Sequence, residues 1–519
     1  MLKVSNIAVS LDEKDYAKVI ANTLNIRKSQ VKNVKIAKKA VDARRKNKVH
    51  FNMGFTFEYV DEDQLLKTHS KQVSKVKEYH YDKLTPNNQT IMVVGSGPAG
   101  LFCAYNLARS GQKVILVEQG KCVDERKKDI DTYLETGKLN TQSNVQFGEG
   151  GAGTFSDGKL TTGIKDYRKQ FVLNTFYEHG ASEDILYLNK PHLGTDVLID
   201  VVKNIRKDIE KCGEVRFETK LVDLVIENNQ LKEVVLENKE GTYKEKVDQL
   251  VLAIGHSARE TFYLLHEKNI TMAPKPFAVG VRIEHPQKMI NESQYGKYAH
   301  LLPPANYKLT YTTKDNRGVY SFCMCPGGFV VNASSQEGHL AINGMSNYNR
   351  SEENANSALV VTVNPKDYGT DLFAGLTFQE KLEESACKLG NGKVPVQLYK
   401  DFKEDKESTT FLDIRPVHKG AYTFANLNEC LPEFIASSIK EAIPEFAKKI
   451  TGYDTPGAIL SAIESRTSSP IRIERDENYT SNIAGVYPCG EGSGYAGGIT
   501  TAAMDGFKVA EAIIKKYHN

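Results

Sequence analysis

The sequence lacks several features that would each place the chain in a special class. No apolar run approaches the ~18 residues that a membrane-spanning helix needs. The N-terminus carries acidic side chains where a signal peptide has a basic start followed by an apolar run. No internal repeat is visible. We therefore expect a soluble cytoplasmic protein that makes no membrane contact.

Paired cysteines are also missing. The eight cysteines are scattered along the chain, and none forms a Cys-x-x-Cys pair. This spacing argues against a disulfide framework and against a zinc site. We expect reduced thiols, as in a cytoplasmic protein, and no metal site.

Length and composition are those of an ordinary globular protein. The 519 residues, 40% hydrophobic and 26% charged, suggest about two to four domains. The net charge of +3 is unevenly distributed, because residues 1–90 hold 18 Lys and Arg against 10 Asp and Glu. Ten of these basic residues lie between Arg27 and Lys48, with a single acid, Asp42. Such a segment can bind nucleic acid or an acidic partner, but a solvated helix face is the commoner reason for it.

The hydrophobic pattern divides the chain into a small module and a larger body. Residues 1–60 read as strand, helix and an aromatic-rich strand, followed by a polar linker. A buried strand of the parallel type, TIMVVG, opens the body. Short strands with turns at 228–229 and 240–241 follow, and then a mixed region of strands and helices. The expected parts are a basic α+β module (1–85), a first segment of the main domain (86–275), an inserted domain (276–450) and a second segment of the main domain (451–519), which the motifs below assign to nucleotide binding.

The expectation of a nucleotide domain comes from IMVVGSGPAGLFCAYNLARSGQKVILVEQG, which fits the dinucleotide-binding fingerprint at each constrained position. Gly95 permits the tight turn out of the strand, Gly97 lets the backbone approach a pyrophosphate, and Gly100 lets the helix pack on the strand. The helix N-terminus offers unpaired N–H groups to phosphates. Glu118 ends the second strand, where a carboxylate can bind ribose hydroxyls and disfavours a 2′-phosphate. The residues assigned to this unit are Gly95, Ser96, Gly97, Pro98, Ala99, Gly100, Glu118, Gln119 and Gly120.

Two further glycine-rich segments lie far from the fingerprint. Residues 144–163 contain six glycines and no large aliphatic side chain between Val145 and Leu160, so some interaction must offset the entropy of ordering them. The segment CGEGSGYAGGITTAAMDGF places glycines where a strand meets a C-terminal helix. The ribityl chain and ring of FAD need backbone amides beyond the first helix, and both segments are suited to supply them. The residues predicted to do so in the second segment are Gly490, Glu491, Gly497, Gly498 and Ile499.

Taken together, these motifs resemble those of the glutathione-reductase-type FAD oxidoreductases. Residues 85–519 are similar in detail to a largely uncharacterised group of bacterial FAD-dependent dehydrogenases, the NAD(FAD)-utilising dehydrogenases. The resemblance implies an α/β fold with a discontinuous Rossmann-type FAD domain, an inserted α+β substrate domain and a small N-terminal α+β module. It implies no particular substrate. The strings that carry it are SNVQFGEGGAGTFSDGKLTT, KPHLGTD, LAIGHSARET, KPFAVGVRIEHPQ, SFCMCPGG, ESRTSSPIRI and YPCGEGSGYAGGI.

The resemblance also implies which residues meet the non-covalently bound FAD. The glycine-rich loop would run under the cofactor, and a middle strand would end near the flavin. Residues so implied are Gly150, Gly151, Ala152 and Gly153 for the ribityl-pyrophosphate, Thr154, Ser156, Asp157 and Lys159 for the ring, Arg126 for the ADP half, Leu221 and Val222 for adenine, and Ala253 and Gly255 for the middle strand.

Two side chains are candidates for catalysis. Lys159 would place a cation near the flavin and stabilise its reduced anion, although a solvent-exposed loop lysine fits the sequence equally well. Arg466 is followed by hydroxyl residues and would anchor an anionic substrate, although arginines in loops more often form structural pairs.

Cysteines and histidines give weaker signals. Cys323 and Cys325 would share one face of a strand, but their spacing is not the Cys-x-x-Cys of disulfide reductases, which favours buried, inert thiols. His256 and His418 have no visible partner, which favours packing or hydrogen-bonding roles over acid catalysis.

A second nucleotide fingerprint is absent from residues 266–450, so no separate NAD(P)H domain is expected. Either NAD(P)H reduces the flavin directly, as a transient reductant, or the substrate supplies the electrons. The sequence predicts an FAD-dependent oxidoreductase that transfers hydride between a small substrate and FAD. One alternative is a nucleic-acid-directed, RNA-modifying flavoprotein that uses the basic module. Another is a protein in which FAD is only structural. The oligomeric state is left open.

Overall fold

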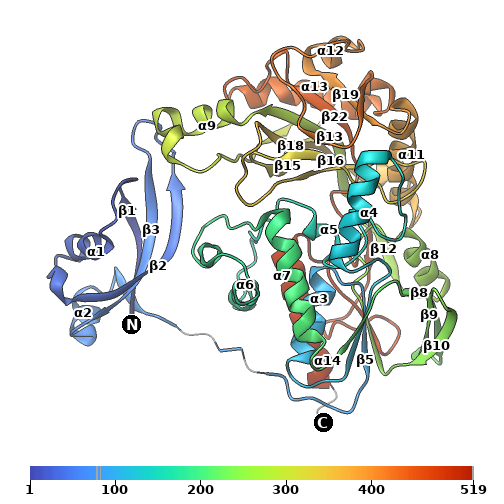
Figure 1. The fold of residues 1–519 in the computed structure, drawn as a ribbon, viewed down its shortest axis with the longest axis horizontal. Coiled ribbons are helices and arrows are strands. Elements are labelled where there is room, and N and C mark those ends of the chain that lie inside the picture. The colour runs from blue at the N-terminus through green and yellow to red at the C-terminus, as the bar shows by residue number, and fades with distance from the viewer. Residues whose placement is uncertain (78–79, 82, 517–519) are drawn as a thin grey trace.

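A five-stranded parallel sheet forms the centre of the body in the computed structural model, which describes residues 1–77, 80–81 and 83–516 (Figure 1). The strand order is β24-β11-β5-β6-β7, and each neighbouring pair is parallel. The order of the strands in the sheet therefore reverses direction at β5. In open α/β sheets, ligands bind beyond the carboxyl ends of the strands at such a point. The strands are β5 (Ile91–Val94), β6 (Val114–Val117), β7 (Glu214–Arg216), β11 (Gln249–Leu252) and β24 (Val486–Pro488).

Both faces of this sheet are buried, which explains its continuous apolar strands. Alternate residues enter two different cores: Val93 packs against helices, whereas its neighbour Met92 packs against an antiparallel sheet. That three-stranded sheet turns at Asn228 and Asn229, both with positive φ, as the sequence predicts. Its strands are β8 (Lys220–Glu227), β9 (Gln230–Asn238) and β10 (Gly241–Lys246). Helices of this part of the body are α3 (Pro98–Ala108), α4 (Val123–Thr136), α5 (Gly151–Thr154), α6 (Arg168–Glu178), α7 (Gly194–Ile209), α8 (Arg259–Glu267) and α14 (Ile499–Lys516), with 3₁₀ turn η2 (Glu183–Leu186).

A second, seven-stranded sheet covers the carboxyl ends of the parallel strands, in the order β14-β15-β18-β13-β22-β19-β21. Its strands are β13 (Phe277–Pro286), β14 (Thr310–Thr312), β15 (Gly318–Cys325), β18 (Asn354–Val363), β19 (Val394–Leu398), β21 (Tyr422–Phe424) and β22 (Ile459–Glu464). Smaller pairings join β16 (Phe329–Asn332), β17 (Ile342–Met345) and β20 (His418–Lys419), and β12 (Met272–Pro274) with β23 (Ile471–Ile473). The helical elements here are α9 (Gln287–Tyr295), η3 (Gly296–Leu301), α10 (Pro365–Tyr368), α11 (Ala374–Leu389), α12 (Tyr399–Glu404), η4 (Leu427–Glu429) and α13 (Glu433–Ala447).

One expected boundary needs correction. The second FAD-domain segment was expected to begin at residue 451, but β22 pairs with β13 and β19 of the second sheet. The chain therefore leaves this sheet only after Glu464. A fully buried strand gives no local sign of the sheet that it joins, because its partners β19 and β13 lie outside its own stretch of the sequence.

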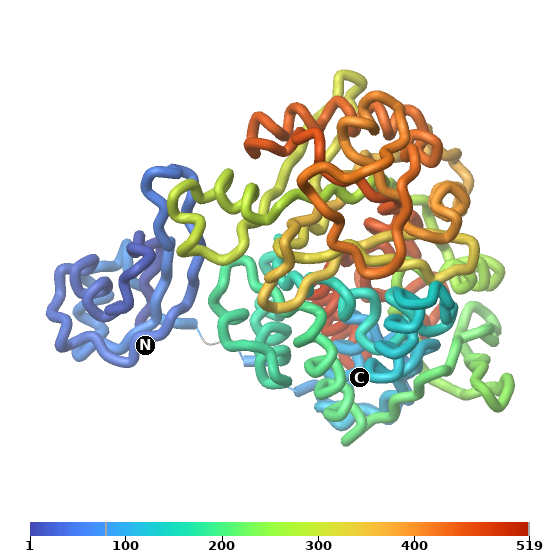
Figure 2. The backbone as a smooth tube through the Cα atoms, turned by 45° about the horizontal axis from the view of Figure 1, so that its top comes forward, coloured from blue at the N-terminus to red at the C-terminus, as the bar shows by residue number. Residues whose placement is uncertain are grey.

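The N-terminal module lies to one side of the body, with its β2–β3 hairpin beside α9 (Figures 1 and 2). Hydrogen bonds from Lys39 N–H to Tyr187 O (2.8 Å) and from Asn189 N–H to Lys39 O (2.9 Å) join the hairpin to the body. Its sheet has the order β2-β3-β1-β4. The elements are β1 (Leu2–Val9), α1 (Tyr16–Leu24), η1 (Lys28–Gln30), β2 (Val31–Asp42), β3 (His50–Tyr59), α2 (Glu62–Thr68) and β4 (Val73–Lys75).

The sequence favoured a solvated helix face for the basic segment of this module, and this prediction is wrong. Most of it forms strand β2, an edge strand whose lysines are largely solvated. Edge strands commonly carry lysine because the charge prevents pairing with another chain. The expected fold class is confirmed: an α/β body with a discontinuous Rossmann-type sheet, a second mixed region and a small α+β module. Among the described helices, none has the length and apolar character to cross a membrane.

Candidate functional site

A cavity with a volume of about 280 Å³ opens where the parallel strands end, between the two sheets. All three glycine-rich segments reach it, since Gly97, Gly151 and Gly498 line its wall. Three segments that are separate in the sequence therefore face one space, as the sequence argument requires. The second sheet, the segment that follows its strand β22 and the neighbouring strand β17 supply the opposite wall, through Phe322, Cys323, Asn343, Glu464, Arg466 and Thr467.

The first glycine turn leaves no room for a side chain. A Cβ on Gly95, whose φ is +96°, would lie 2.4 Å from Ala253 O, and a Cβ on Gly100 would lie 1.8 Å from Gly95 O. Helix α3 starts immediately afterwards, with Gly97 as its N-cap and no side chain capping its N–H groups. These donors at the positive end of the helix are thus left for a ligand in the cavity.

A second helix N-terminus reaches the same cavity because α14 crosses α3 closely. A Cβ on Gly506 would lie 2.1 Å from Ala99 O, so only glycine permits this approach. The crossing places Ile499, the first residue of α14, on the cavity wall beside Ala99. Two positive helix ends therefore face one cavity.

The carboxylate of Glu118 joins three backbone segments beside the cavity. Its carboxylate accepts hydrogen bonds from Ser96 N–H (2.9 Å), Ser96 Oγ (2.8 Å), Gly120 N–H (2.9 Å) and Gly148 N–H (3.1 Å). The carboxylate also lines the cavity, so the predicted ribose contact stays a prediction, alongside this structural role. Ser96 is buried and binds Glu118 rather than facing the cavity.

The resemblance implies that Arg126 contacts the ADP half of the cofactor. In the structure, Arg126 instead binds the glycine-rich loop and does not line the cavity. Its buried guanidinium donates to main-chain carbonyls of the loop over distances of 2.7–3.2 Å. Burial lowers the pKa of Arg126 to about 10, partly offset by Glu118 and Glu149. These bonds offset the entropy of ordering the loop. The accepting carbonyls are those of Asn144, Val145, Gly148, Glu149 and Gly151.

The end of this loop carries an ion-paired carboxylate. Asp157 binds Arg350 through two hydrogen bonds (2.9 and 2.7 Å), and Lys159 Nζ lies 2.7 Å from Asp157 Oδ2. Burial opposes the charge of Asp157, but Lys159 and Arg350 hold the pKa of Asp157 well below its ordinary value. Both Asp157 and Lys159 line the cavity. Lys159 is therefore not the solvent-exposed loop lysine of the alternative interpretation, although its only close partner among the described residues is Asp157.

Arg466 belongs to a buried cluster in which two arginines share one carboxylate. Glu383 accepts from Arg466 (2.9 and 2.9 Å) and from Arg259 (3.0 and 3.0 Å). Burial alone would raise the pKa of Glu383, but the two guanidinium charges lower it to about 2. Glu380 lies 3.7 Å from Arg259 as a second carboxylate, and Arg466 is the member of this cluster that lines the cavity. Arg466 also donates to Ser335 Oγ (2.6 Å) and Ser257 Oγ (3.2 Å).

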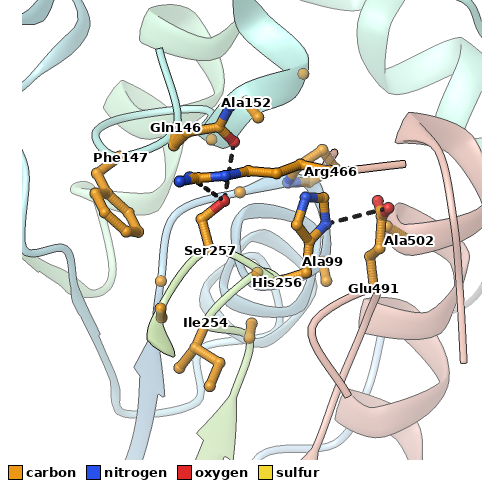
Figure 3. A pocket seen from close by; sticks show the side chains of 18 of the residues that line it. Ala99, Gln146, Phe147, Ala152, Ile254, His256, Ser257, Arg466, Glu491 and Ala502 are labelled. Atoms are coloured by element: carbon orange, nitrogen blue, oxygen red, sulfur yellow. Dashed lines mark hydrogen bonds and ion pairs between the residues drawn. The ribbon is translucent and has the colours of Figure 1, made fainter. Parts of the chain in front are cut away.

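His256 and Glu491 face each other across the cavity wall, as Figure 3 shows. His256 Nδ1 lies 3.4 Å from Glu491 Oε1, and its buried Nε2 has no hydrogen-bond partner among the described residues. Burial raises the pKa of Glu491, but His256 and the Gly498 N–H more than offset this and lower it. Beside them, Ser257 Oγ donates to Gln146 Oε1 (3.1 Å). The unpartnered Nε2 points to a missing ligand atom, a signal that the sequence does not carry.

The cavity brings together most of the predicted site residues. Those that line it are Gly95, Gly97, Pro98, Ala99, Glu118, Gln119, Gly151, Ala152, Gly153, Ser156, Asp157, Lys159, Leu221, Ala253, Gly255, Arg466, Glu491, Gly498 and Ile499. Those that lie behind the wall or beside it are Ser96, Gly100, Gly120, Arg126, Gly150, Thr154, Val222, Gly490 and Gly497. Lining residues that sequence reasoning did not assign include Gln146, Phe147, Ser257, Phe322 and Asn343.

This donor set fits FAD. Its two phosphates need open N–H groups, which α3 supplies, and its long ribityl-flavin arm needs a second backbone surface, which the loop and the start of α14 supply. His418, by contrast, is buried away from this cavity and hydrogen-bonds Glu284 (3.0 Å), in the structural role that the sequence favoured.

Comparisons with known proteins agree with this interpretation. Residues 89–268 match the family model described as pyridine nucleotide-disulphide oxidoreductase, and residues 276–467 match the model described as FAD-dependent protein, C-terminal domain-like. Residues 1–58 match a domain of unknown function, DUF8436. These matches define the class of protein: it is an FAD-dependent oxidoreductase.

Within this class, one curated relative covers the chain almost completely. An uncharacterised protein of Clostridium beijerinckii is 46% identical over 531 residues, or 99% of each chain. The chain belongs to the same family as that protein.

Solved structures give only remote likenesses. L-proline dehydrogenase from P. horikoshii is 12% identical, with 83% of this chain and 94% of that chain covered and a TM-score of 0.36. The flavin-dependent brominase Bmp2 is 13% identical, with 83% and 79% covered and a TM-score of 0.38. Likenesses at this level carry no argument about substrate.

Proposed function

We propose that the protein transfers hydride between a small anionic substrate and FAD bound in the cavity between the two sheets. One observation carries this proposal: the open N-terminus of α3, the start of α14 and side chains of the second sheet line a single cavity. A cofactor on the first sheet and a substrate against the second would therefore meet in one enclosed space.

Residues of the first sheet would hold the cofactor. The N–H groups at the start of α3 would bind the pyrophosphate, Glu118 and Gln119 the adenosine ribose, and the main chain of Leu221 the adenine. When bound, FAD supplies a ring that accepts or donates a hydride. Lys159 would favour negative charge near that ring, because its ammonium lies on the cavity wall.

The second sheet would face the substrate. Arg466 is the arginine of its cluster that lines the cavity, and its guanidinium would attract an anion such as a carboxylate. Ser257 Oγ, on the same wall, already accepts a hydrogen bond from Arg466 (3.2 Å) and would help to hold the guanidinium in place. Arg466 thus supports the choice of an anionic substrate.

NAD(P)H would act as the transient reductant, reaching the flavin through this cavity rather than from a domain of its own. The eight cysteines are all free, which supports the expected cytoplasmic location. None of the matches favours the RNA-directed alternative, and the basic residues of β2 lie on a module away from the cavity.

The test is an absorbance spectrum of the purified chain, followed by anaerobic titration with NADH and NADPH. We expect a bound flavin that one of the two nucleotides bleaches. Gly97→Val, which places a branched side chain at the α3 N-terminus, should lower FAD affinity at least tenfold. Gly163→Val is a matched control, because a Cβ at Gly163 meets no atom within 4 Å. A colourless protein that does not rebind FAD would overturn the proposal, and a bound flavin that no reductant changes would indicate a structural cofactor.

A further inference from the structure

Cys323 faces the cavity, against the expectation that both cysteines of the Cys-Met-Cys sequence are buried together. Strand β15 pairs Phe322 with Ala358 and Cys325 with Asn356, so two of its residues stand opposite one residue of β18. This is a β-bulge, which bends the strand and re-aims a side chain. Cys323 has a φ of +42° there, rare for a residue other than glycine. The bulge turns Cys323 onto the cavity wall, while Cys325 is fully buried behind it.

The two thiols remain close enough to react with each other. Cys325 Sγ donates to the carbonyl oxygen of Cys323 over 3.3 Å. Residues two apart on an extended strand have Cα atoms roughly 6.5 Å apart, and a bulge shortens this. A disulfide spans Cα separations of about 4.4–6.8 Å, so a bridge between them requires little backbone movement.

Cations surround Cys323 on two sides. Lys159, from the glycine-rich loop, lines the same cavity as Cys323, and Arg282 from β13 donates to the Cys323 carbonyl (3.3 Å). The nearby carboxylates already have cationic partners: Asp157 pairs with Arg350 and Lys159, and Glu464 pairs with Arg282 (2.9 Å). The three cations, which are Lys159, Arg282 and Arg350, outnumber the two carboxylates by one. A thiolate at Cys323 would neutralise this positive charge.

The hydrogen bond from Cys325 and the charges of Lys159 and Arg282 outweigh burial and hold the pKa of the Cys323 thiol well below its ordinary value. The same contact with Cys323, together with burial, raises the pKa of Cys325. An attacking thiolate on the cavity side and a protonated partner behind it form the arrangement of a reactive dithiol.

We propose that Cys323 and Cys325 are a redox-active dithiol that exchanges two electrons with the flavin in this cavity. This inference rests on the proposed function for its electron acceptor. In the oxidising direction, the Cys323 thiolate and the Cys325 thiol form an S–S bond and release one proton and two electrons, which oxidised FAD accepts. In the reverse direction, reduced FAD supplies the two electrons that break the S–S bond. The enzyme would then store two electron pairs, one on the flavin and one on the dithiol.

The first experiment measures the thiols themselves in the purified holoprotein. Iodoacetamide labelling followed by peptide mass spectrometry should modify Cys323 at neutral pH at least tenfold faster than exposed Cys212, whose thiol serves as the internal reference. Glutathione disulfide should oxidise the Cys323–Cys325 peptide to an internal disulfide, and Cys325→Ser should instead trap a mixed disulfide on Cys323. Slow labelling together with no internal disulfide would overturn the dithiol, whether or not FAD binds.

The second experiment measures electron storage. Anaerobic reductive titration of the oxidised holoprotein should consume two electron pairs per flavin, and only one in Cys323→Ser and in Cys325→Ser. Cys212→Ser is the control and should still consume two. Equal consumption by the wild type and Cys323→Ser would overturn the exchange with flavin. If the chain binds no FAD but still forms the internal disulfide, the proposed function and the flavin step both fall while the dithiol stands.

Discussion

Arg350 Nη2 lies 2.7 Å from Asp157 Oδ2 and joins the glycine-rich loop to the loop that follows β17, a strand of the small sheet β17-β16-β20. Ser346 Oγ, from that same loop, donates to Asp157 Oδ1 (2.5 Å). The carboxylate is thus a buried junction between the two halves of the cavity. Asp157 therefore holds the two walls of the cavity together.

Removing this charge should destabilise the body strongly. Asp157→Asn leaves Arg350 and Lys159 buried without an anion, and breaking such a buried pair costs about 3–5 kcal/mol. Denaturant unfolding at neutral pH measures the loss. Glu477→Gln, at an exposed position, is the control and should leave the free energy of unfolding unchanged within about 0.5 kcal/mol.

The same pair predicts a pH dependence with a definite sign. The pKa of Asp157 is lower in the folded protein than its ordinary value of 3.8. Its contribution is therefore complete above that value and is lost as the pH falls toward the folded-state pKa. The difference in unfolding free energy between the wild type and Asp157→Asn should shrink as the pH falls below about 4. A difference that is constant with pH would contradict the assignment.

Arg126 should be essential for the glycine-rich loop. Arg126→Met strands the main-chain carbonyls that the guanidinium now satisfies, and each unsatisfied buried group costs about 1–3 kcal/mol. We expect a loss of about 3–5 kcal/mol in unfolding free energy and at least tenfold weaker FAD binding, measured by flavin fluorescence. Arg45→Met, at an exposed position, should change neither. A stable variant with normal affinity would show that the loop orders itself.

Gly506→Ala tests the crossing of α3 and α14. Helix propensity alone predicts stabilisation by about 1 kcal/mol, because alanine replaces glycine inside a helix. The contact predicts the opposite, since the new Cβ would lie 2.1 Å from Ala99 O and force the helices apart. Overpacking of this kind costs about 1–3 kcal/mol. We expect a lower melting temperature and weaker FAD binding, whereas Lys515→Ala, near the exposed end of α14, should do neither.

His256→Ala should change how the free energy of unfolding depends on pH in the acidic range. Without His256, burial of Glu491 is no longer offset by the facing imidazole, so the pKa of Glu491 should rise. A carboxyl whose folded-state pKa lies below its unfolded value contributes stability above that value, and the contribution shrinks as the folded-state pKa rises toward the unfolded one. Unfolding measured between about pH 6 and about pH 3 should therefore show a lower free energy of unfolding at the start and a smaller loss on acidification in the variant. His300→Ala, at an exposed position, should follow the wild type.

Much of the cofactor half of the site follows from local sequence. Gly100 is needed because the carbonyl oxygen of Gly95 leaves no room for a Cβ, and Gly95 itself takes a φ of +96°, so both constraints act within one strand, turn and helix. The burial of β5 and β6 on both faces likewise appears as unbroken apolar runs. Such signals span only a few residues and can be recognised in one chain.

The basic segment shows where local patterns mislead. The lysines of β2 stand at positions 32, 35, 38 and 39, a spacing that also fits one face of a solvated helix, and pairing with β3 decides for the strand. The assignment of β22 to the second sheet fails for the same reason, because its partner β13 lies far away in the sequence.

The sequence by itself determined the Rossmann-type unit and the positions of its glycines, because both rest on backbone geometry that neighbouring residues dictate, and it predicted the three glycine-rich segments that line one cavity. Tertiary structure alone decided that Arg126 orders a loop, that Glu383 is shared by two arginines and that a bulge turns Cys323 onto the cavity wall. Those outcomes depend on which distant groups are buried together, since a buried charge or thiol takes its chemistry from neighbours that no local pattern specifies.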